Sequence, residues 1–396
     1  MLKRRKMLRL FSLILISIML ILLIGCGNND KKEVSDPEDG IETQEEVPEK
    51  DETPEEADKT TDDISKIGIS MPTKSLQRWN QDGSYMQEML TEAGYEVDLQ
   101  YAGDNDISLQ VSQVENMITS GCDVLVITAI DASSLSEVLK SAEEKNIHVI
   151  AYDRLILNTD ALSYYVTFDN EVVGELQAQY IVDALDLDES DEPHNIELVA
   201  GAPDDNTANF FWTGSMRVLE PYLESGQLIV PSGQTAQEQA ATIEYSMEES
   251  QKRMENLISA QGYGSEGTEL SAVLAVNDST ANGVTNALIA AGLTAENFPV
   301  ITGQDCDIAS MKNILNGTQS MSVFKDTRDS SARVVKMVES IASGQEVEVN
   351  DTETYDNGNG IVPAYLCDPV SCTIDNYEEL LIESGYYTYD DLDVEP

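Results

Sequence analysis

Charged side chains stand directly after a short apolar run in the stretch VIAYDRLI. Residues 149–151 have the composition of a buried strand, and Asp153 and Arg154 follow at its end. A carboxylate accepts hydrogen bonds from hydroxyl groups, whereas a guanidinium donates them in a planar fork. An adjacent acid and base at a strand end can therefore bind a neutral ligand that carries several hydroxyl groups, such as a sugar.

Similar polar residues follow most of the other apolar runs. Taken singly, such a residue is more often a helix N-cap than a ligand contact, and Asp169, Asn206 and Ser279 fit that interpretation. In open parallel sheets, however, ligands bind at the carboxyl ends of the strands, so recurrence at many strand ends favours a shared site. The positions concerned are residues 73–79, Asp131, Asp153, Arg154, residues 204–207, Asn277, Asp278, Gln304, Asp305, Lys325 and Asp326.

An aromatic ring is also expected at such a site, because the apolar face of a sugar ring packs on it and excludes water. The chain has two tryptophans, Trp79 and Trp212. Trp79 follows Arg78 and is predicted to lie in the cleft as a packing face. Trp212 lies inside an expected helix and is predicted to be a core residue.

The elements that position these residues alternate between short apolar runs and longer segments with helical spacing, such as residues 134–145. This alternation predicts parallel sheets with helices on both faces. About ten strands are many for one sheet, so two doubly wound domains are expected. The expected strands are residues 66–70, 96–101, 124–129, 148–152, 163–168, 195–200, 228–231, 272–276, 300–302 and 321–324.

The N-terminal region differs from the rest in composition. Basic residues dominate the first nine positions and an apolar run over residues 10–24 follows, which is a secretory signal pattern and short for a membrane span. The run ends at Gly25 and Cys26 and resembles the lipobox of bacterial lipoproteins, so residues 1–25 are predicted to be a signal peptide and Cys26 to be lipidated. Residues 27–65 hold sixteen acidic and four basic side chains. This composition predicts that residues 26–65 form a disordered tether.

The composition also argues against several functions. A formal net charge of −50 disfavours nucleic-acid binding, which needs a basic surface. The two histidines belong to no zinc-type motif, so neither a metal site nor a cofactor is expected. Cys122 and Cys306 are interpreted as small core residues. A local disulfide between Cys367 and Cys372 is one possibility outside the cytoplasm, and free thiols are the other.

Motifs in both halves of the chain point to one family. They are IGISMPTKSLQRWNQDG, CDVLVITAIDASSLSEVLKSA, VIAYDRLI, FDNEVVGELQA, GAPDDN, VITGQDCD and VFKDTRD, within residues 66–390. Together they resemble the periplasmic sugar-binding proteins of the ribose, galactose and xylose class, closest to the multiple sugar-binding receptor and xylose-binding branch. The resemblance implies a type I periplasmic binding protein, an α/β fold with two doubly wound parallel-sheet lobes joined by a three-crossover hinge. It implies an N-terminal lobe of residues 66–168 and 306–345, and a C-terminal lobe of residues 169–305 and 346–396.

The resemblance also implies which residues contact a monosaccharide held between the lobes. The chain departs from the family at Thr207, where relatives usually carry asparagine, and at Thr235, where the xylose branch carries tryptophan. Xylose, glucose, galactose and arabinose therefore all stay open as ligands. The implied polar contacts are Arg78, Asp153, Arg154, Asp205, Asn206, Asn277, Asp305 and Lys325, with Trp79 as a packing face.

The implied function is that of a monomeric, non-enzymatic lipoprotein on the extracytoplasmic face of the cell membrane, anchored through Cys26. It would deliver the sugar to the permease of an ABC transporter. The alternative is a sugar-sensing receptor whose closed form contacts a chemotaxis or sensor-kinase partner. A glycosidase that uses Asp204 and Asp205 is not expected, because sequence neighbours seldom face each other across a substrate. A repressor of the lactose-repressor type is not expected either, because the segment before residue 66 does not resemble a DNA-binding headpiece.

Overall fold

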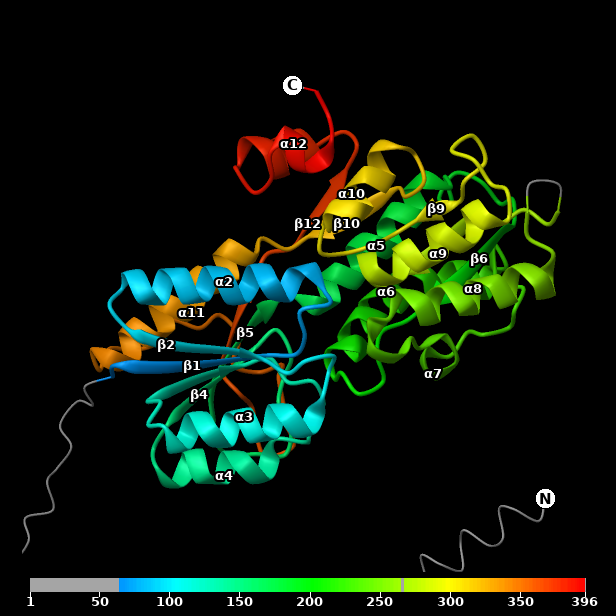
Figure 1. Ribbon diagram of the computed structural model, residues 1–396. Helices are drawn as coiled ribbons and strands as arrows, with labels where there is room; N and C mark the ends of the chain where they lie inside the picture. The colour runs from blue at the N-terminus through cyan, green and yellow to red at the C-terminus, as the bar shows by residue number, and fades with distance from the viewer. Residues whose placement is uncertain (1–63, 265–266, 396) are drawn as a thin grey trace, which may run out of the picture. The chain divides into compact units, whose positions relative to one another are not determined.

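The computed structural model describes residues 64–264 and 267–395, so the predicted signal peptide, Cys26 and nearly all of the acidic tether lie outside the described residues. Two groups of strands organise the described part, and helices cover both faces of each (Figure 1). We call the part built on the six-stranded sheet the first lobe, and the part built on the four-stranded sheet the second lobe.

The first lobe contains parallel strands in the order β11-β5-β4-β3-β1-β2. Its central strands are apolar on both faces: Val124 and Val126 of β3 pack in one core cluster with α2 and α11, and Leu125 and Ile127 pack in another with α3 and α4. Two-sided burial is why these strands read as continuous apolar runs in the sequence. The elements are β1 (Lys66–Met71), α2 (Gln77–Glu92), β2 (Glu96–Tyr101), α3 (Ile107–Thr119), β3 (Val124–Ile127), α4 (Ser136–Glu144), β4 (His148–Tyr152), β5 (Leu162–Phe168), α11 (Thr327–Ala342) and β11 (Ala364–Cys367).

The second lobe contains parallel strands in the order β7-β6-β8-β9. Helices α5 and α6 pack in one core cluster and α8 and α9 in another. The elements are α5 (Asn170–Ala184), β6 (His194–Val199), α6 (Thr207–Ser225), β7 (Leu228–Ile229), α7 (Gln237–Ala240), a 3-10 turn (Ile243–Tyr245), α8 (Met247–Gln261), β8 (Ala272–Ala275), α9 (Asp278–Ala290) and β9 (Val300–Ile301).

Two glycines let α5 and α6 approach each other closely. A Cβ atom on Gly174 would lie 2.1 Å from the carbonyl oxygen of Phe211, and one on Gly214 would lie 2.0 Å from that of Glu171. Any larger residue would force the two helices apart. The contact therefore fixes the position of the N-terminal half of α6, which carries Phe211.

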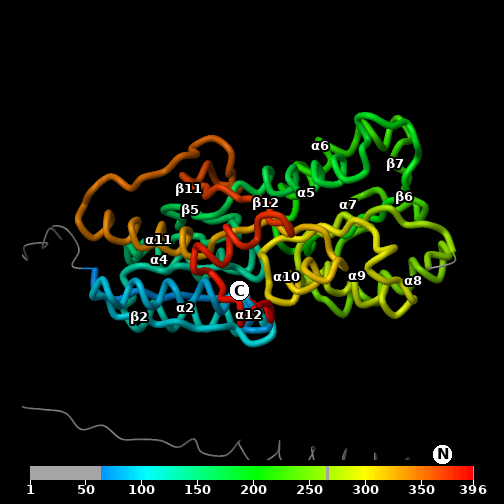
Figure 2. The backbone as a smooth tube through the Cα atoms, turned by 90° about the horizontal axis from the view of Figure 1, so that it is seen from above, coloured from blue at the N-terminus to red at the C-terminus, as the bar shows by residue number. Residues whose placement is uncertain are grey.

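The chain passes between the lobes three times, after β5, after β10 (Met321–Phe324) and after β11. Strand β10 pairs with β12 (Val370–Thr373) in an antiparallel ribbon, which joins the second lobe through a parallel bridge between Gln304 and Val323. Helix α10 (Ile308–Leu315), a π-helical segment (Glu378–Glu383) and α12 (Tyr389–Leu392) pack on this ribbon, and Figure 2 shows α12 beside α10. Two doubly wound lobes with three crossovers confirm the predicted fold class.

The expected lobe boundaries need correction in the C-terminal third. Helix α10 and strand β10 lie with the second lobe, although they belong to the 306–345 segment expected in the first. Strand β11 pairs with β5 of the first lobe, although it belongs to the 346–396 segment expected in the second. All ten expected strands are present, but the sequence pattern does not predict β11 and β12. Each of them has four residues, so pairing with distant strands, not local composition, determines their place.

The four cysteines of the described residues are free and buried. Cys122 and Cys306 are core residues, as expected. The possible disulfide between Cys367 and Cys372 is absent. Cys367 ends β11 in the first lobe, whereas Cys372 lies in β12 beside β10, so the crossover between β11 and β12 separates them.

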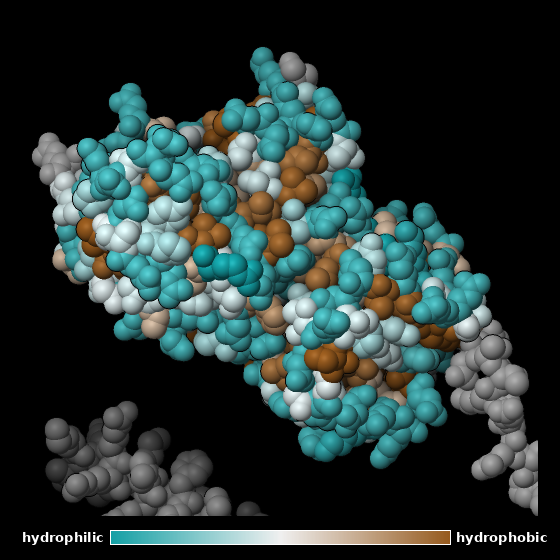
Figure 3. Space-filling view, turned by 180° about the vertical axis from the view of Figure 1, so that it is seen from behind, coloured by the Kyte–Doolittle hydropathy of each residue, from teal (hydrophilic) through white to brown (hydrophobic). Residues whose placement is uncertain are grey.

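Hydrophilic residues predominate on the face shown in Figure 3, and apolar residues form smaller groups between them. This surface agrees with the strongly acidic composition of the chain. None of the helices in the described part of the chain has the length and apolar composition needed to cross a bilayer.

Candidate functional site

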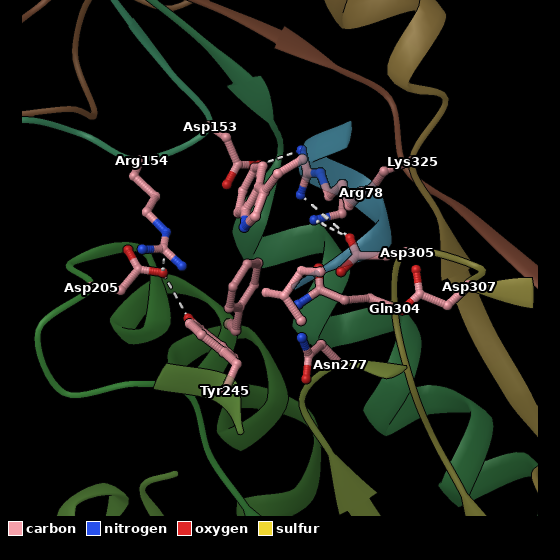
Figure 4. Close-up of a pocket in the computed structure, with 13 residues that line it drawn as sticks. Arg78, Asp153, Arg154, Asp205, Tyr245, Asn277, Gln304, Asp305, Asp307 and Lys325 are labelled. Carbon is pink, nitrogen blue, oxygen red and sulfur yellow. Dashed lines mark hydrogen bonds and ion pairs between the residues drawn. The ribbon is translucent and has the colours of Figure 1, made fainter. Parts of the chain in front are cut away.

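A pocket lies where the two lobes meet at the carboxyl ends of their strands, and Figure 4 shows polar side chains from both lobes around it. The empty space inside it, open solvent included, is about 440 Å³. Eight of the nine residues expected at the site line this pocket. The lining residues are Leu76, Arg78, Trp79, Asp153, Arg154, Asp205, Phe211, Tyr245, Asn277, Gln304, Asp305, Asp307 and Lys325.

Arg78 is the central cation of the pocket. It lies in the first turn of α2, and its guanidinium contacts three carboxylates: Nε lies 3.0 Å from Oδ2 of Asp82, Nη2 lies 2.5 Å from Oδ1 of Asp153, and Nη1 lies 3.3 Å from Oδ1 of Asp305. Asp82 is one helical turn further along α2 and is also held by the hydroxyl of Tyr152, which donates at 2.8 Å. Because Asp305 belongs to the second lobe, Arg78 links the two lobes.

Burial and neighbouring charges shift the pKa values of these carboxyls in opposite directions. Burial raises the pKa of Asp82 to about 6, although the charge of Arg78 acts to lower it. Burial also acts to raise the pKa of Asp153, but the attraction to Arg78, Lys325 and Arg154 prevails and the pKa is lowered. Asp153 is therefore a charged hydrogen-bond acceptor at neutral pH.

The backbone of Asp153 is in the left-handed region, with φ 61°. Its carbonyl oxygen accepts hydrogen bonds from the hydroxyls of Tyr165 at 2.5 Å and Thr167 at 3.1 Å, both in β5. Asp305 and Tyr245 share the feature, with φ 96° and 53°. Residues other than glycine adopt this region at an energetic cost, which the surrounding structure must offset. The contacts around Asp153 therefore stabilise a strained turn that positions its side chain at the pocket.

Arg154 makes a second contact between the lobes. Its Nε lies 3.5 Å from Oδ2 of Asp205 in the second lobe, and its Nη1 donates to the carbonyl oxygens of Ala129 at 3.2 Å and Ile130 at 3.3 Å. The hydroxyl of Tyr245 donates to the same Asp205 oxygen at 2.7 Å. These partners fix the plane of the guanidinium at the edge of the pocket.

Further polar groups come from the second lobe. Lys325 follows β10, and its Nζ lies 2.8 Å from Oδ1 of Asp305. Asn277 caps α9, where its Oδ1 accepts the backbone N–H of Thr280 at 3.1 Å. Gln304 donates to the carbonyl oxygen of Val276 at 2.8 Å, and its Oε1 is buried without a hydrogen-bond partner among the described residues. Gln304 thus has an acceptor free for a ligand.

Besides Tyr245, two aromatic rings line the pocket between these polar groups. Trp79 is 4% exposed, and the guanidinium carbons of Arg78 and Arg154 lie 4.9 Å and 5.4 Å from its ring centroid. Such contacts favour a cation over the ring face. The indole N–H of Trp79 has no acceptor within the described part of the chain. Phe211 lines the pocket from α6 of the second lobe.

Asn206 is the one expected contact that the structure does not place in the pocket lining. It is the N-cap of α6, and its Oδ1 accepts a hydrogen bond from the side chain of Asn209 at 3.3 Å. The helix start directs its neighbour Asp205 into the pocket instead. Asn206 stands at the N-cap position of α6, but its side chain forms no capping hydrogen bond, so the capping interpretation holds for its position only.

Sequence reasoning did not select Phe211, Tyr245, Gln304 and Asp307 as contacts. Gln304 directly precedes Asp305 in the GQD motif and already stood among the strand-end positions. Tyr245 follows no strand, because it lies in a 3-10 turn with left-handed backbone, so no sequence signal marks it.

The remaining positions of interest lie outside the pocket lining. Trp212 is partly buried and packs against the core of the second lobe, as expected. Thr207 is buried at the start of α6, and its backbone N–H donates to Oδ1 of Asp205 at 2.9 Å. Thr235 is exposed. The two departures from the family pattern therefore make no direct contact with the pocket, and Thr207 acts on it through Asp205.

Asp307 gives the pocket a pH-dependent charge. Burial raises its pKa to about 7, the negative charge of Asp305 adds to the rise, and Arg78 and Lys325 oppose it. Its backbone N–H donates to Oδ2 of the buried Asp278 at 2.8 Å. Because the folded state holds this proton more tightly than the unfolded chain, the contribution to stability is present below about pH 4 and is lost as the pH rises to about 7.

We therefore expect Asp307→Asn to stabilise the protein by about 2 kcal/mol at pH 8 and much less at pH 5. The Asp307 side chain forms no capping hydrogen bond, so the amide removes the charge without removing a cap. Calorimetric unfolding at the two pH values measures the effect. An equal change in unfolding free energy at both pH values would contradict the raised pKa of Asp307.

The described part of the chain contains no group of three or more histidine, cysteine or acidic side chains arranged to hold a metal ion. Three of the lining carboxylates, those of Asp153, Asp205 and Asp305, are paired with arginine, lysine or tyrosine. What the arrangement can do is bind a small polar molecule.

Comparison with known proteins gives consistent results. Residues 67–346 match the model of the family described as periplasmic binding protein domain. The chain is 48% identical over 332 residues to the multiple sugar-binding periplasmic receptor ChvE of Rhizobium radiobacter, covering 83% of this chain and 93% of the relative. It is 36% identical over 327 residues to the D-xylose-binding periplasmic protein of Escherichia coli, covering 83% and 92%.

Solved structures agree with these relatives. An ABC transporter solute binding protein from Clostridium phytofermentans, determined with bound β-D-glucose, is 56% identical and superposes with a TM-score of 0.80, covering 83% of this chain and all of that one. A carbohydrate transporter solute binding protein from Chloroflexus aurantiacus, in complex with D-glucose, is 32% identical with a TM-score of 0.73.

Proposed function

The chain belongs to the periplasmic binding protein domain family, and on that premise we propose that it binds one monosaccharide between its two lobes. The proposed ligand is a neutral pentose or hexose of the xylose or glucose type. The closed, loaded protein would deliver the sugar to the permease of an ABC transporter from the extracytoplasmic face of the membrane, with Cys26 as its lipid anchor.

The observation that carries this proposal is the pairing of acids and bases across the pocket. Arg78 and Arg154 of the first lobe each contact a carboxylate of the second, Asp305 and Asp205. A sugar hydroxyl placed between such partners can accept from the guanidinium and donate to the carboxylate at once. Ligand binding and lobe closure would then depend on the same side chains.

The charge balance of the pocket supports a neutral ligand. Its three cations, Arg78, Arg154 and Lys325, are each paired with a lining carboxylate. An anionic ligand would compete with those carboxylates, and a cationic ligand would compete with the bases. Hydroxyl groups can enter the same network without changing its net charge. The ring of Trp79 would supply the apolar face that a pyranose needs.

The proposed cycle has no covalent step. In the open state a sugar binds to one lobe, and closure about the three crossovers lets residues of the other lobe complete its hydrogen bonds. The surfaces that a permease would contact then take a fixed relative position. The support for delivery to a transporter comes from the relatives named above, two of which are transporter solute binding proteins.

A thermal-shift screen of the purified full chain against D-glucose, D-xylose, D-galactose and L-arabinose tests the proposal. A ligand present at 100 times its dissociation constant adds about 2.7 kcal/mol, which raises the melting temperature by about 5 °C. Mannitol and sodium gluconate serve as an open-chain and a charged control. If no sugar of the panel changes the melting temperature, the proposed function is wrong.

A further inference from the structure

Two buried cysteines from distant parts of the sequence meet beside the pocket. Cys306 directly follows Asp305, and Cys372 lies in β12; both are fully buried in the same core cluster. Ser322 of β10 lies against each of them. Cys372 is its register partner in the antiparallel ribbon, and the backbone N–H of Cys306 donates to its hydroxyl at 3.0 Å.

The two thiol groups lie on the same side of β10, beside Ser322. Sγ of Cys306 lies 3.8 Å from the carbonyl oxygen of Ser322, on the side of β10 where Cys372 pairs. Burial raises the pKa of the Cys306 thiol, and its hydrogen bond to the Cys372 thiol raises it further. Neither of the other described cysteines offers this contact, since Cys367 lies in β11 and Cys122 in the core between α3 and β3.

We propose that Cys306 and Cys372 form a disulfide bond in the exported protein. The two thiols lose two protons and two electrons as the S–S bond forms, and a disulfide oxidant such as oxidised glutathione is reduced to two thiols. Such bonds persist in oxidising compartments outside the cytoplasm. The inference therefore rests on the proposed extracytoplasmic location.

The bond would close the chain over residues 306–372, the segment that leaves the second lobe, forms α11 and β11 of the first, and returns as β12. It would tie the turn that follows Asp305 to β12, the second-lobe end of the third crossover. A cross-link over so long a loop restricts the unfolded chain strongly. The oxidised protein should therefore keep the crossovers and the Asp305 turn in register when the lobes open.

Peptide mapping of the full chain isolated from an exporting bacterial host tests the bond directly. The protein is denatured in iodoacetamide without reductant, digested and analysed by mass spectrometry. We expect a linked peptide pair that contains Cys306 and Cys372, with Cys122 and Cys367 alkylated. A linked pair that contains Cys367, or four alkylated cysteines, would overturn the proposal.

Refolding separates this inference from the proposed function. The reduced chain is refolded in oxidised and reduced glutathione, and its melting temperature is expected to rise by about 5 °C relative to refolding in dithiothreitol. The rise should be lost in the Cys306→Ala and Cys372→Ala variants and kept in Cys367→Ala, the matched control. If the thiols of the wild-type chain stay free in the glutathione buffer, the disulfide proposal is wrong, whether or not the chain binds a sugar. If no sugar changes the melting temperature, only the proposed function is contradicted.

Discussion

Replacing Arg78 with methionine is expected to weaken sugar binding by more than about 100-fold, equivalent to about 2.7 kcal/mol, and to destabilise the protein. Arg78 is 5% exposed, and its guanidinium is shared by Asp82, Asp153 and Asp305. Methionine fills part of its volume but leaves three carboxylates without their common cation. Breaking a buried ion pair by removing one partner costs about 3–5 kcal/mol. The substitution also removes the contact between residue 78 and Asp305 of the second lobe.

Titration calorimetry with the sugar that gives the largest thermal shift measures the affinity, and urea unfolding measures the stability. Arg217→Met is the matched control, because Arg217 is an exposed arginine that pairs with Glu171 and Glu175 away from the pocket. Should Arg78→Met fail to fold, Arg78→Lys keeps the charge but cannot reach three carboxylates with one planar fork. It is expected to fold and to bind at least about 10-fold more weakly. Unchanged affinity in either variant would remove Arg78 from the site.

Asp305→Asn is expected to weaken sugar binding by about 10- to 150-fold, or about 1.5–3 kcal/mol. Oδ1 of Asp305 lies 2.8 Å from Nζ of Lys325 and 3.3 Å from Nη1 of Arg78, so the change removes one charge from a contact that joins the lobes. Asparagine is chosen because the φ of 96° at this residue strains alanine more than asparagine. The asparagine amide keeps one hydrogen-bond acceptor, so the expected loss of sugar affinity is smaller than for Arg78→Met.

The same calorimetric titration checks this prediction, with Asp160→Asn as control because that aspartate is exposed and lies outside the pocket lining. The unfolding free energy should fall as well, because Arg78 keeps Asp82 and Asp153 whereas the buried Lys325 loses its carboxylate partner. An affinity equal to that of the unchanged protein would show that Asp305 only supports the fold.

Local composition was sufficient to locate ten of the twelve strands in the described residues and most of the pocket. Strands such as β3 are buried on both faces, so their side chains are apolar without interruption and stand out from the helical segments. The polar residues Asp153 and Arg154 end one such run, and parallel strands bring their ends to one edge. For these features the information lies within about ten consecutive residues.

Features set by contacts between distant residues could not be predicted in this way. Strand β11 belongs to the first lobe because it pairs with β5, and nothing in its four residues specifies that partner. Phe211 rather than Trp212 lines the pocket because one step along a helix rotates the side chain by about 100°, and the crossing of α5 with α6 sets the rotation. Tyr245 lines the pocket from a turn with left-handed backbone, which local sequence does not specify.

The sequence by itself determined the two-lobed α/β class, the positions of ten strands and a shared polar site at the strand ends, because periodicity and burial act along the chain. Only the tertiary structure decided which lobe each C-terminal strand joins and that Asp205, and not Asn206, lines the pocket. It also decided that Cys372 lies near Cys306 and not near Cys367. These outcomes depend on how separate elements pack, and packing is a property of residues far apart in sequence.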